Sequence, residues 1–248
     1  MRLTDVATVI WKEWKMFKDQ LGWESSRWGT AVVAVLFVVL NCFGAYRAGA
    51  AWVMSPAMLL IYPFTAAAIA IQPIVDSFAG ERERHTLETL LASRLSDSAI
   101  LIGKILGAVL PAVVFALVMF ALAILAVNLF HAEGDLLVPP PWLWVGTSLL
   151  TVGMAGLVGT GGVFVSLRAS TVRQATQTFG FVLVGALVMP VVVVMLMPDS
   201  LRNEFLAWVQ TTDPLRLTLT ACAGVITLDA LFLIAAVKRF RRGRLILD

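Results

Sequence analysis

Residues 105–129 read ILGAVLPAVVFALVMFALAILAVNL and contain no charged side chain. A helix crosses the hydrocarbon core of a bilayer with ~20 predominantly apolar residues, so this run is long enough to span a membrane. Five further apolar runs of about this length occur along the chain. The six predicted spans are residues 30–46, 51–75, 102–129, 142–166, 178–197 and 216–237.

The composition supports the same class of protein. The 248 residues are 59% hydrophobic and 14% charged, against about 25% charged residues in an average soluble domain, and the mean hydropathy is +0.88. We therefore predict an all-α polytopic membrane protein and exclude a soluble enzyme. The net charge of +3 gives little support for nucleic-acid binding. With two cysteines in apolar runs and two histidines, we expect neither a disulfide framework nor a metal or cofactor site in this chain.

The basic residues predict the orientation. An even number of spans places both termini on one side of the membrane, and cytoplasmic segments are enriched in Lys and Arg. All but three of the 19 basic residues fall on the side of the termini; the exceptions are Arg47, Arg202 and Arg216. We expect both termini in the cytoplasm and the protein in the inner or plasma membrane, with a transmembrane domain at 30–237 and a basic cytoplasmic tail at 238–248.

Residues 1–29 carry a helical pattern before the first span. Apolar residues recur at spacings of three and four, namely Leu3, Val6, Ile10, Trp14, Phe17 and Leu21. Lys12, Lys15 and Asp19 take the opposite face. This pattern predicts an amphipathic helix lying at the inner membrane interface, and an unstructured basic tail remains the alternative. On the outer side, Leu201, Phe205 and Trp208 share one face of a predicted short interfacial helix.

Small and kinking residues interrupt the spans. The fourth span contains Gly153, Gly156, Gly159, Gly161 and Gly162, which favour close packing of helix backbones in lipid; a hinge or a substrate-lining surface is the alternative. The second span contains Pro56, Pro63 and Pro73, and membrane helices tolerate prolines of this kind.

Asp229 is the carboxylate that lies well inside a span, about 12 Å from its cytoplasmic end. An ionised group at this depth is costly unless it is paired or hydrated. We favour a hydrogen-bonded structural aspartate, with Asn41, Gln72 or Asn128 as candidate neighbours. An intramembrane ion site is the alternative.

The segment between the second and third spans, residues 76–104, is far more charged than a connector requires. Its charges nearly cancel, which argues against a polybasic lipid-binding patch; they belong to Asp76, Glu81, Glu83, Glu88, Asp97, Arg82, Arg84, Arg94 and Lys104. Leu87, Leu90 and Leu91 form an apolar stripe at helical spacing, which suits a protein surface. Ser96, followed by Asp97, is a candidate N-cap for the next helix.

This segment resembles the type-2 permeases of ATP-binding-cassette (ABC) transporters, particularly the short six-helix prokaryotic branch. The similarity is carried by Glu81-Arg82-Glu83-Arg84-His85-Thr86-Leu87-Glu88-Thr89-Leu90-Leu91, by Leu95-Ser96, and by Ile100-Leu101-Ile102-Gly103-Lys104. Trp11-Lys12-Glu13 matches the family's amphipathic helix before the first span. The chain departs from the family pattern at His85, where glycine is usual, and at Arg94-Leu95, where proline usually precedes the serine.

The resemblance implies that residues 76–104 contain a cytoplasmic coupling helix seated on a separate ABC ATPase subunit, which binds ATP and Mg²⁺. Two ATPase subunits and a second permease chain, identical or homologous, would complete an exporter in the lipid bilayer. The residues that the resemblance assigns to ATPase coupling are Glu81, Glu83, Thr86, Leu87, Glu88, Leu90, Leu91, Gly103 and Lys104.

Two other functions remain open at this point. An intramembrane lipid-modifying enzyme would use Asp76, Glu81, Glu83 and His85 around a headgroup, and a non-transporting scaffold or assembly factor would need no reaction at all. Gly103-Lys104 does not form a phosphate-binding loop, because Ser98 stands where that motif needs glycine and Ile105 where it needs Ser or Thr. We therefore expect ATP hydrolysis in a partner chain and no catalysis in this one.

Overall fold

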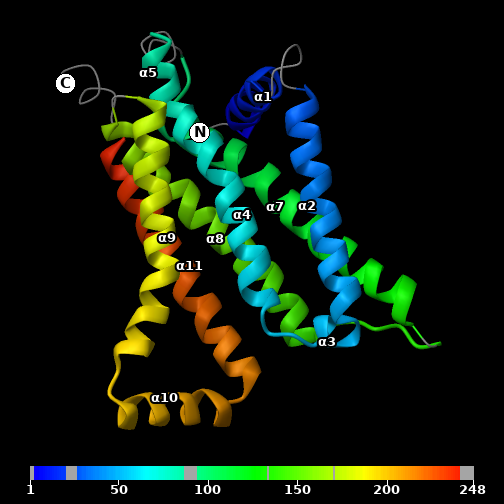
Figure 1. The fold of residues 1–248 in the computed structure, drawn as a ribbon. Helices are drawn as coiled ribbons and strands as arrows, with labels where there is room; N and C mark the ends of the chain where they lie inside the picture. Colours follow the sequence, from blue (N-terminus) through cyan, green and yellow to red (C-terminus); the bar gives the residue numbers. More distant parts are fainter. Residues whose placement is uncertain (1–2, 21–26, 87–93, 133, 170, 241–248) are drawn as a thin grey trace.

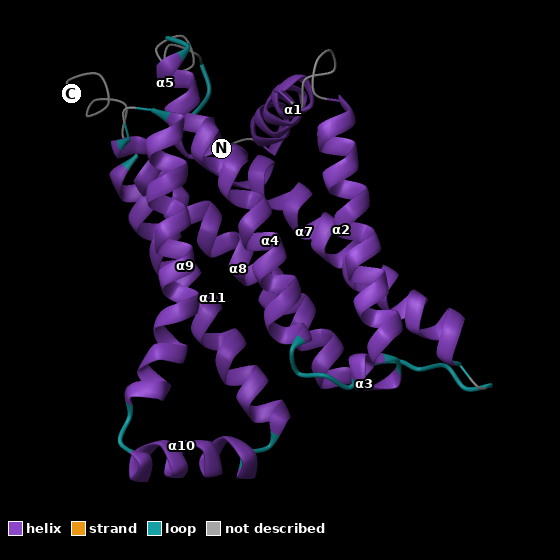
Figure 2. Cartoon of the chain, in the orientation of Figure 1, coloured by secondary structure: helices purple, strands orange, loops and turns teal. Residues whose placement is uncertain are grey.

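The computed structural model describes residues 3–20, 27–86, 94–132, 134–169 and 171–240, and within these ranges the chain is helical with no strand (Figure 2). Six helices form the bundle: α2 (Arg27–Ala48), α4 (Met58–Val75), α7 (Asp97–His131), α8 (Pro141–Arg168), α9 (Val172–Leu196) and α11 (Pro214–Arg239). Shorter elements are α1 (Leu3–Gln20), α3 (Ala50–Val53), the π-helix η1 (Asp76–Gly80), α5 (Glu81–Glu83) and α10 (Asp199–Thr211).

Among the described residues, five stretches are long and apolar enough to cross a membrane by length and composition: Met58–Glu83, Asp97–His131, Pro141–Arg168, Val172–Leu196 and Pro214–Arg239. A shorter apolar stretch, Val35–Ala48, lies in α2. Together they confirm the prediction of an all-α polytopic membrane protein.

The second predicted span starts too early. The sequence placed it at 51–75, but the chain forms the short helix α3, turns at Met54–Ala57 and begins α4 at Met58. Pro56 explains the break, because proline has no backbone N–H to donate and disfavours the helical conformation of the residue before it. Pro63 and Pro73 lie inside α4, as expected.

The two ends of the bundle carry different short helices (Figure 1). α1 and α5 lie at the end where α11 finishes, whereas α3 and α10 lie at the opposite end. α10 confirms the predicted short helix, and its Leu201, Phe205 and Trp208 side chains are exposed.

Helix α8 holds the bundle together through its glycines. A Cβ on Gly153 would lie 2.7 Å from Val225 on α11, one on Gly159 would lie 2.7 Å from Val109 on α7, and one on Gly162 would lie 2.7 Å from Ile74 on α4. These separations are shorter than van der Waals contact, so side chains there would push three neighbouring helices away. The predicted close packing of this span is confirmed.

Candidate functional site

The candidate site begins where α4 continues past Val75 into η1 and α5. The π-helical turn of η1 carries one residue more per hydrogen-bonded ring than an α-helix, an irregularity that is frequent at functional sites. A Cβ on Gly80 would lie 2.1 Å from Asp76 Oδ1, so a larger residue there would displace the Asp76 side chain. Ser77 and Phe78 are buried. The turn delivers the next residue, Glu81, into the interior with 1% of its surface exposed.

Glu81 belongs to an ionic cluster, which we define as Lys12, Glu13, Glu81 and Lys104; Glu81 and Lys104 are buried, whereas the Lys12 side chain is 39% exposed. Lys104 Nζ on α7 lies 3.0 Å from Glu13 Oε1 on α1 and 3.1 Å from Glu81 Oε2. Lys12 Nζ donates to Glu81 Oε1. Two cations and two carboxylates from three elements thus neutralise one another, which is the condition for keeping ions out of water.

Lys104 is the centre of this cluster because its side chain is fully buried. Its ammonium also donates to the Ser77 carbonyl of η1, and it lies 5.0 Å from the centroid of the Phe78 ring, a favourable cation–π geometry. The ammonium thus contacts Ser77 and Phe78 of η1 and Glu81 of α5, and all three residues are positioned by the π-helical turn. The cluster therefore fixes the position of α5 relative to α7.

Helix α1 reaches the cluster by packing closely on α7. Val6 and Val9 are buried. A Cβ on Gly103 would lie 2.6 Å from Val9 Cβ, and one on Gly107 would lie 2.9 Å from Glu13 Cβ. The two glycines let the α1 backbone approach α7, and Glu13 can then meet Lys104. Gly103 and Lys104, both predicted as site residues, thus lie on the surface that receives α1.

The sequence predicted the α1 helix correctly but assigned its faces only in part. Val6 is buried against the protein and Trp14 is 51% exposed, so part of the apolar face packs on another helix and part stays open to lipid. Lys12, expected on the face opposite the apolar one, donates to Glu81. The prediction assumed that lipid alone would cover the apolar face. In the structure α1 packs on another helix, and the face that contacts α7 carries Val6, Val9 and Glu13.

The two residues after Glu81 contact the ends of two neighbouring helices. Arg82 donates from Nη1 to the Ala169 carbonyl and from Nη2 to the Leu167 carbonyl, both at 2.9 Å, at the end of α8. Glu83 Oε1 accepts a hydrogen bond of 2.9 Å from the backbone N–H of Val172 at the start of α9. Each contact places a charge where the helix dipole favours it.

Arg84 closes the segment on itself with an ion pair of 2.9 Å to Asp76. Ser166 of α8 adds a buried bridge, because its Oγ donates to the Val75 carbonyl at 2.7 Å and accepts from the Ala79 N–H at 2.9 Å. The segment 76–84 therefore contacts α1, α7, α8 and α9. A displacement of this segment would reach all four helices.

The end of α5 is a Schellman cap with a residue in the left-handed conformation. His85 has a φ of 55°, its N–H bonds to the Arg82 carbonyl at 3.1 Å, and the Thr86 N–H bonds to the Glu81 carbonyl at 2.9 Å. Glycine is the residue that adopts this φ without strain. The departure from the family pattern at His85 therefore falls at a position where the backbone itself favours glycine.

The structure brings five of the predicted coupling residues to one end of the bundle. Glu81, Gly103 and Lys104 are buried, whereas Glu83 and Thr86 are exposed. Leu87, Glu88, Leu90 and Leu91 lie outside the described residues. The Ser96 N-cap is confirmed, because its Oγ accepts from the Ala99 N–H at 3.3 Å. Sequence reasoning missed the roles of Lys12, Glu13 and Arg82; the Trp11-Lys12-Glu13 motif was the available signal, but nothing in it identified Lys104 as the partner of Glu13.

The carboxylates considered for a lipid-modifying enzyme are engaged within the chain. Asp76 pairs with Arg84, Glu81 lies in the ionic cluster and Glu83 bonds to Val172. Within the described parts of the chain, no group of three His, Cys, Asp or Glu side chains is placed to hold a metal ion.

Asp229 contacts α8 rather than the predicted polar neighbours. Its Oδ1 is hydrogen-bonded to Thr160 Oγ1 at 3.0 Å, and Gly156 makes room for it, because a Cβ there would lie 2.4 Å from Oδ2. Asn41, Gln72 and Asn128 were the wrong candidates: Asn41 donates to the Met119 carbonyl and Asn128 bonds to Leu137, and Gln72 bonds to Thr176. The predicted hydrogen bonding of Asp229 is confirmed with a different partner.

Comparison with known proteins gives one family. The family model described as "ABC-2 family transporter protein" matches residues 9–238, which is most of the chain and includes the whole described site. Among curated proteins, none matches the chain.

Proposed function

Because the chain belongs to the ABC-2 transporter family, we propose that it is an exporter's permease subunit whose residues 76–104 receive the motion of a separate ABC ATPase subunit. The chain is a multi-pass membrane protein and a permease component of an ABC transporter. The ATPase contact, the outward direction of transport and the cytoplasmic position of the α1 end are the parts proposed.

The observation that carries the proposal is the set of contacts made by three consecutive charged residues. Glu81 lies between Lys12 of α1 and Lys104 of α7, Arg82 holds the end of α8, and Glu83 holds the start of α9. Packed elements move as rigid bodies because their interfaces do not deform continuously. A push on this segment would consequently displace several helices together, which is what coupling to a distant ATP site requires.

The ATPase itself would contact the exposed end of this segment and the residues that follow it. Glu83 and Thr86 are exposed at the end of the bundle, and Leu87, Glu88, Leu90 and Leu91 follow directly in the chain. In this proposal Glu81 and Lys104 act inside the permease, since their side chains are buried. ATP and Mg²⁺ would bind in the ATPase subunits, of which two are expected.

A second permease chain would complete the membrane part of the transporter. α9 and α11 expose most of their apolar surface, including Phe181 at 79% and Leu231 at 58%. Lipid or a second chain must cover these faces in a membrane. A homodimer, or a pair with a homologous permease, would place the substrate path between the two chains.

The test of coupling uses Leu87→Asp and Leu90→Asp, with Leu136→Asp as the matched control. Leu136 is 81% exposed and lies in the connection between α7 and α8, away from the proposed contact. We expect the first two variants to lose copurification with the ATPase and stimulation of its activity by the permease, because a carboxylate is costly in an apolar interface. Full retention of both properties, with the control unchanged, would refute the ATPase contact.

The orientation is tested separately by labelling cysteines in intact cells. Arg94→Cys and Leu136→Cys, each in a chain without Cys42 and Cys222, report the two ends of the bundle. An impermeant maleimide should label the cysteine at 136 in intact cells and the cysteine at 94 only after the membrane is opened. The reverse pattern would place residues 76–104 outside the cell and remove the basis of the proposal.

A further inference from the structure

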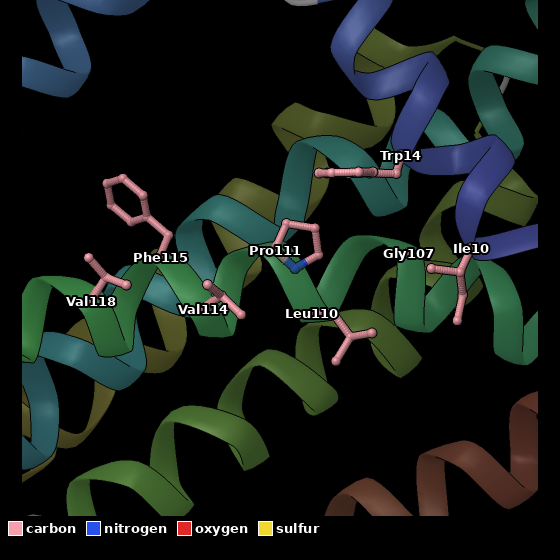
Figure 3. Close-up of a pocket in the computed structure, with 8 residues that line it drawn as sticks. All are labelled: Ile10, Trp14, Gly107, Leu110, Pro111, Val114, Phe115 and Val118. Atoms are coloured by element: carbon pink, nitrogen blue, oxygen red, sulfur yellow. The ribbon is translucent and has the colours of Figure 1, made fainter. Parts of the chain in front are cut away.

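An apolar groove of about 560 Å³ lies between α1 and α7. Figure 3 shows its lining, with Ile10 and Trp14 on α1 and the other six residues along α7. The α7 residues are Gly107, Leu110, Pro111, Val114, Phe115 and Val118. None of the eight lining residues is charged, and most of the lining is apolar, so the groove suits an apolar ligand.

The groove has the length of one bilayer leaflet. Gly107 and Val118 are eleven residues apart on α7, which corresponds to ~16 Å at 1.5 Å per residue, and half of the ~30 Å hydrocarbon core is ~15 Å. Leu110, Val114 and Val118 are 46%, 59% and 47% exposed. The open side of the groove is therefore apolar and belongs to a span, where hydrocarbon rather than water surrounds the protein.

The α1 end of the groove has the chemistry of a membrane interface. Trp14 lines the groove and is 51% exposed, and tryptophan is enriched at headgroup level. The next residue, Lys15, is exposed, and its ammonium lies 5.6 Å from the Trp11 ring centroid. A cation at this position suits the phosphate of a phospholipid whose chain runs along α7.

We propose that this groove binds one acyl chain of a phospholipid from the leaflet in which α1 lies. The chain packs against Ile10, Trp14 and the Pro111 region of α7, and the headgroup stays beside Lys15. Packing provides the preference for the groove over the surrounding bilayer, because lipid tails gain nothing from water exclusion inside a membrane.

The bound chain lies beside the ionic cluster. Gly107 lines the groove and also a small adjoining cavity of about 20 Å³ that Glu13 and Lys104 line. The lipid thus supports α1 on the side of Ile10 and Trp14, while Val9 and Glu13 contact Gly103 and Gly107. The inference rests on the membrane location of the helices and is independent of the ATPase contact.

Photo-crosslinking of the purified full-length chain tests the proposal. The protein is reconstituted into vesicles of phosphatidylethanolamine and phosphatidylglycerol that contain phosphatidylcholine with a diazirine in the middle of one acyl chain. Cross-linked residues are then mapped by mass spectrometry. We expect labels in the groove residues of α1 and α7 well above those on the exposed face of α9, which reports lipid in general contact with the protein.

Two variants sharpen the result. Val114→Trp fills the groove and should remove its labels, whereas Val184→Trp, on the 55% exposed Val184 of α9, should leave them unchanged. Equal labelling of the groove and the α9 face in the unmodified chain would overturn the proposal, and this comparison does not depend on any variant folding. Groove labels that persist in Val114→Trp would also overturn it. Disulfide-linked dimers of Val114→Cys would assign the groove to a second copy of the chain instead.

Discussion

Replacing Lys104 with methionine removes the ammonium at the centre of the ionic cluster and keeps the apolar stem. The change leaves Glu81, which is 1% exposed, and Glu13, whose side chain is 11% exposed, with only Lys12 to balance them. It also removes the donor to the Ser77 carbonyl. Breaking a buried ion pair by deleting one partner costs ~3–5 kcal/mol, because the remaining charge is left uncompensated. We expect Lys104→Met to lower the free energy of unfolding by about this amount.

The double variant Lys104→Met with Glu81→Gln tests whether the loss arises from the unpaired charge. In this variant Lys12 and Glu13, 3.8 Å apart, still balance each other. The double variant should therefore be more stable than the sum of the two single changes predicts, by ~0.5–3 kcal/mol, the range of coupling energies for residues in one network.

The measurement is the unfolding of the purified chain in mixed micelles with increasing dodecyl sulfate, followed by the fluorescence of its eight tryptophans. Lys15→Met is the matched control, because Lys15 is exposed on the same helix that carries Lys12. We expect that control to stay within ~0.5 kcal/mol of the unmodified chain. A loss for Lys104→Met no larger than the loss for Lys15→Met, or additive effects in the double variant, would refute the argument from buried charge.

Three further substitutions test separate contacts. Gly103→Ala places a Cβ 2.6 Å from Val9 and should destabilise the chain by ~1–3 kcal/mol; in the same unfolding assay Gly224→Ala, with nothing within 4 Å, should not, and equal effects would contradict the α1–α7 packing. His85→Gly relieves the left-handed φ of 55° and should raise the free energy of unfolding by up to ~1 kcal/mol; a loss would mean that the His85 side chain has a stabilising contact. Arg82→Met removes the donors to the last carbonyls of α8 and should speed amide hydrogen exchange after residue 168, whereas unchanged exchange there would show that Arg82 does not hold this end.

Much of the membrane architecture follows from the sequence because it depends on local composition. Apolar runs of about 20 residues must form helices in lipid, where every backbone polar group has to be satisfied within the segment. Gly153 and Gly159 predicted close packing for the same local reason. The error at Pro56 also has a local cause: the apolar run continues through residues 54–57, and hydropathy alone does not register the missing backbone donor.

The candidate site was predictable as a segment but not as a set of contacts. The charged run 81–84 stood out between two apolar spans, and the leucine stripe at Leu87, Leu90 and Leu91 remains a prediction. The sequence could not show that Glu81 and Lys104 face inward, because an exposed charge and a buried ion pair look the same in a linear sequence.

Only the tertiary structure decided which charges neutralise one another. Glu13 and Lys104 are far apart in the chain, and they meet because Gly103 and Gly107 let α1 lie against α7 while the η1 turn carries Glu81 inward. Likewise, the partner of Asp229 is Thr160, a residue of the helix that packs on α11. The length of an apolar run is a property of one segment and can be read from the sequence. A buried ion instead depends on the few neighbours within hydrogen-bond distance. The packing of helices that are distant in the sequence determines which residues those neighbours are.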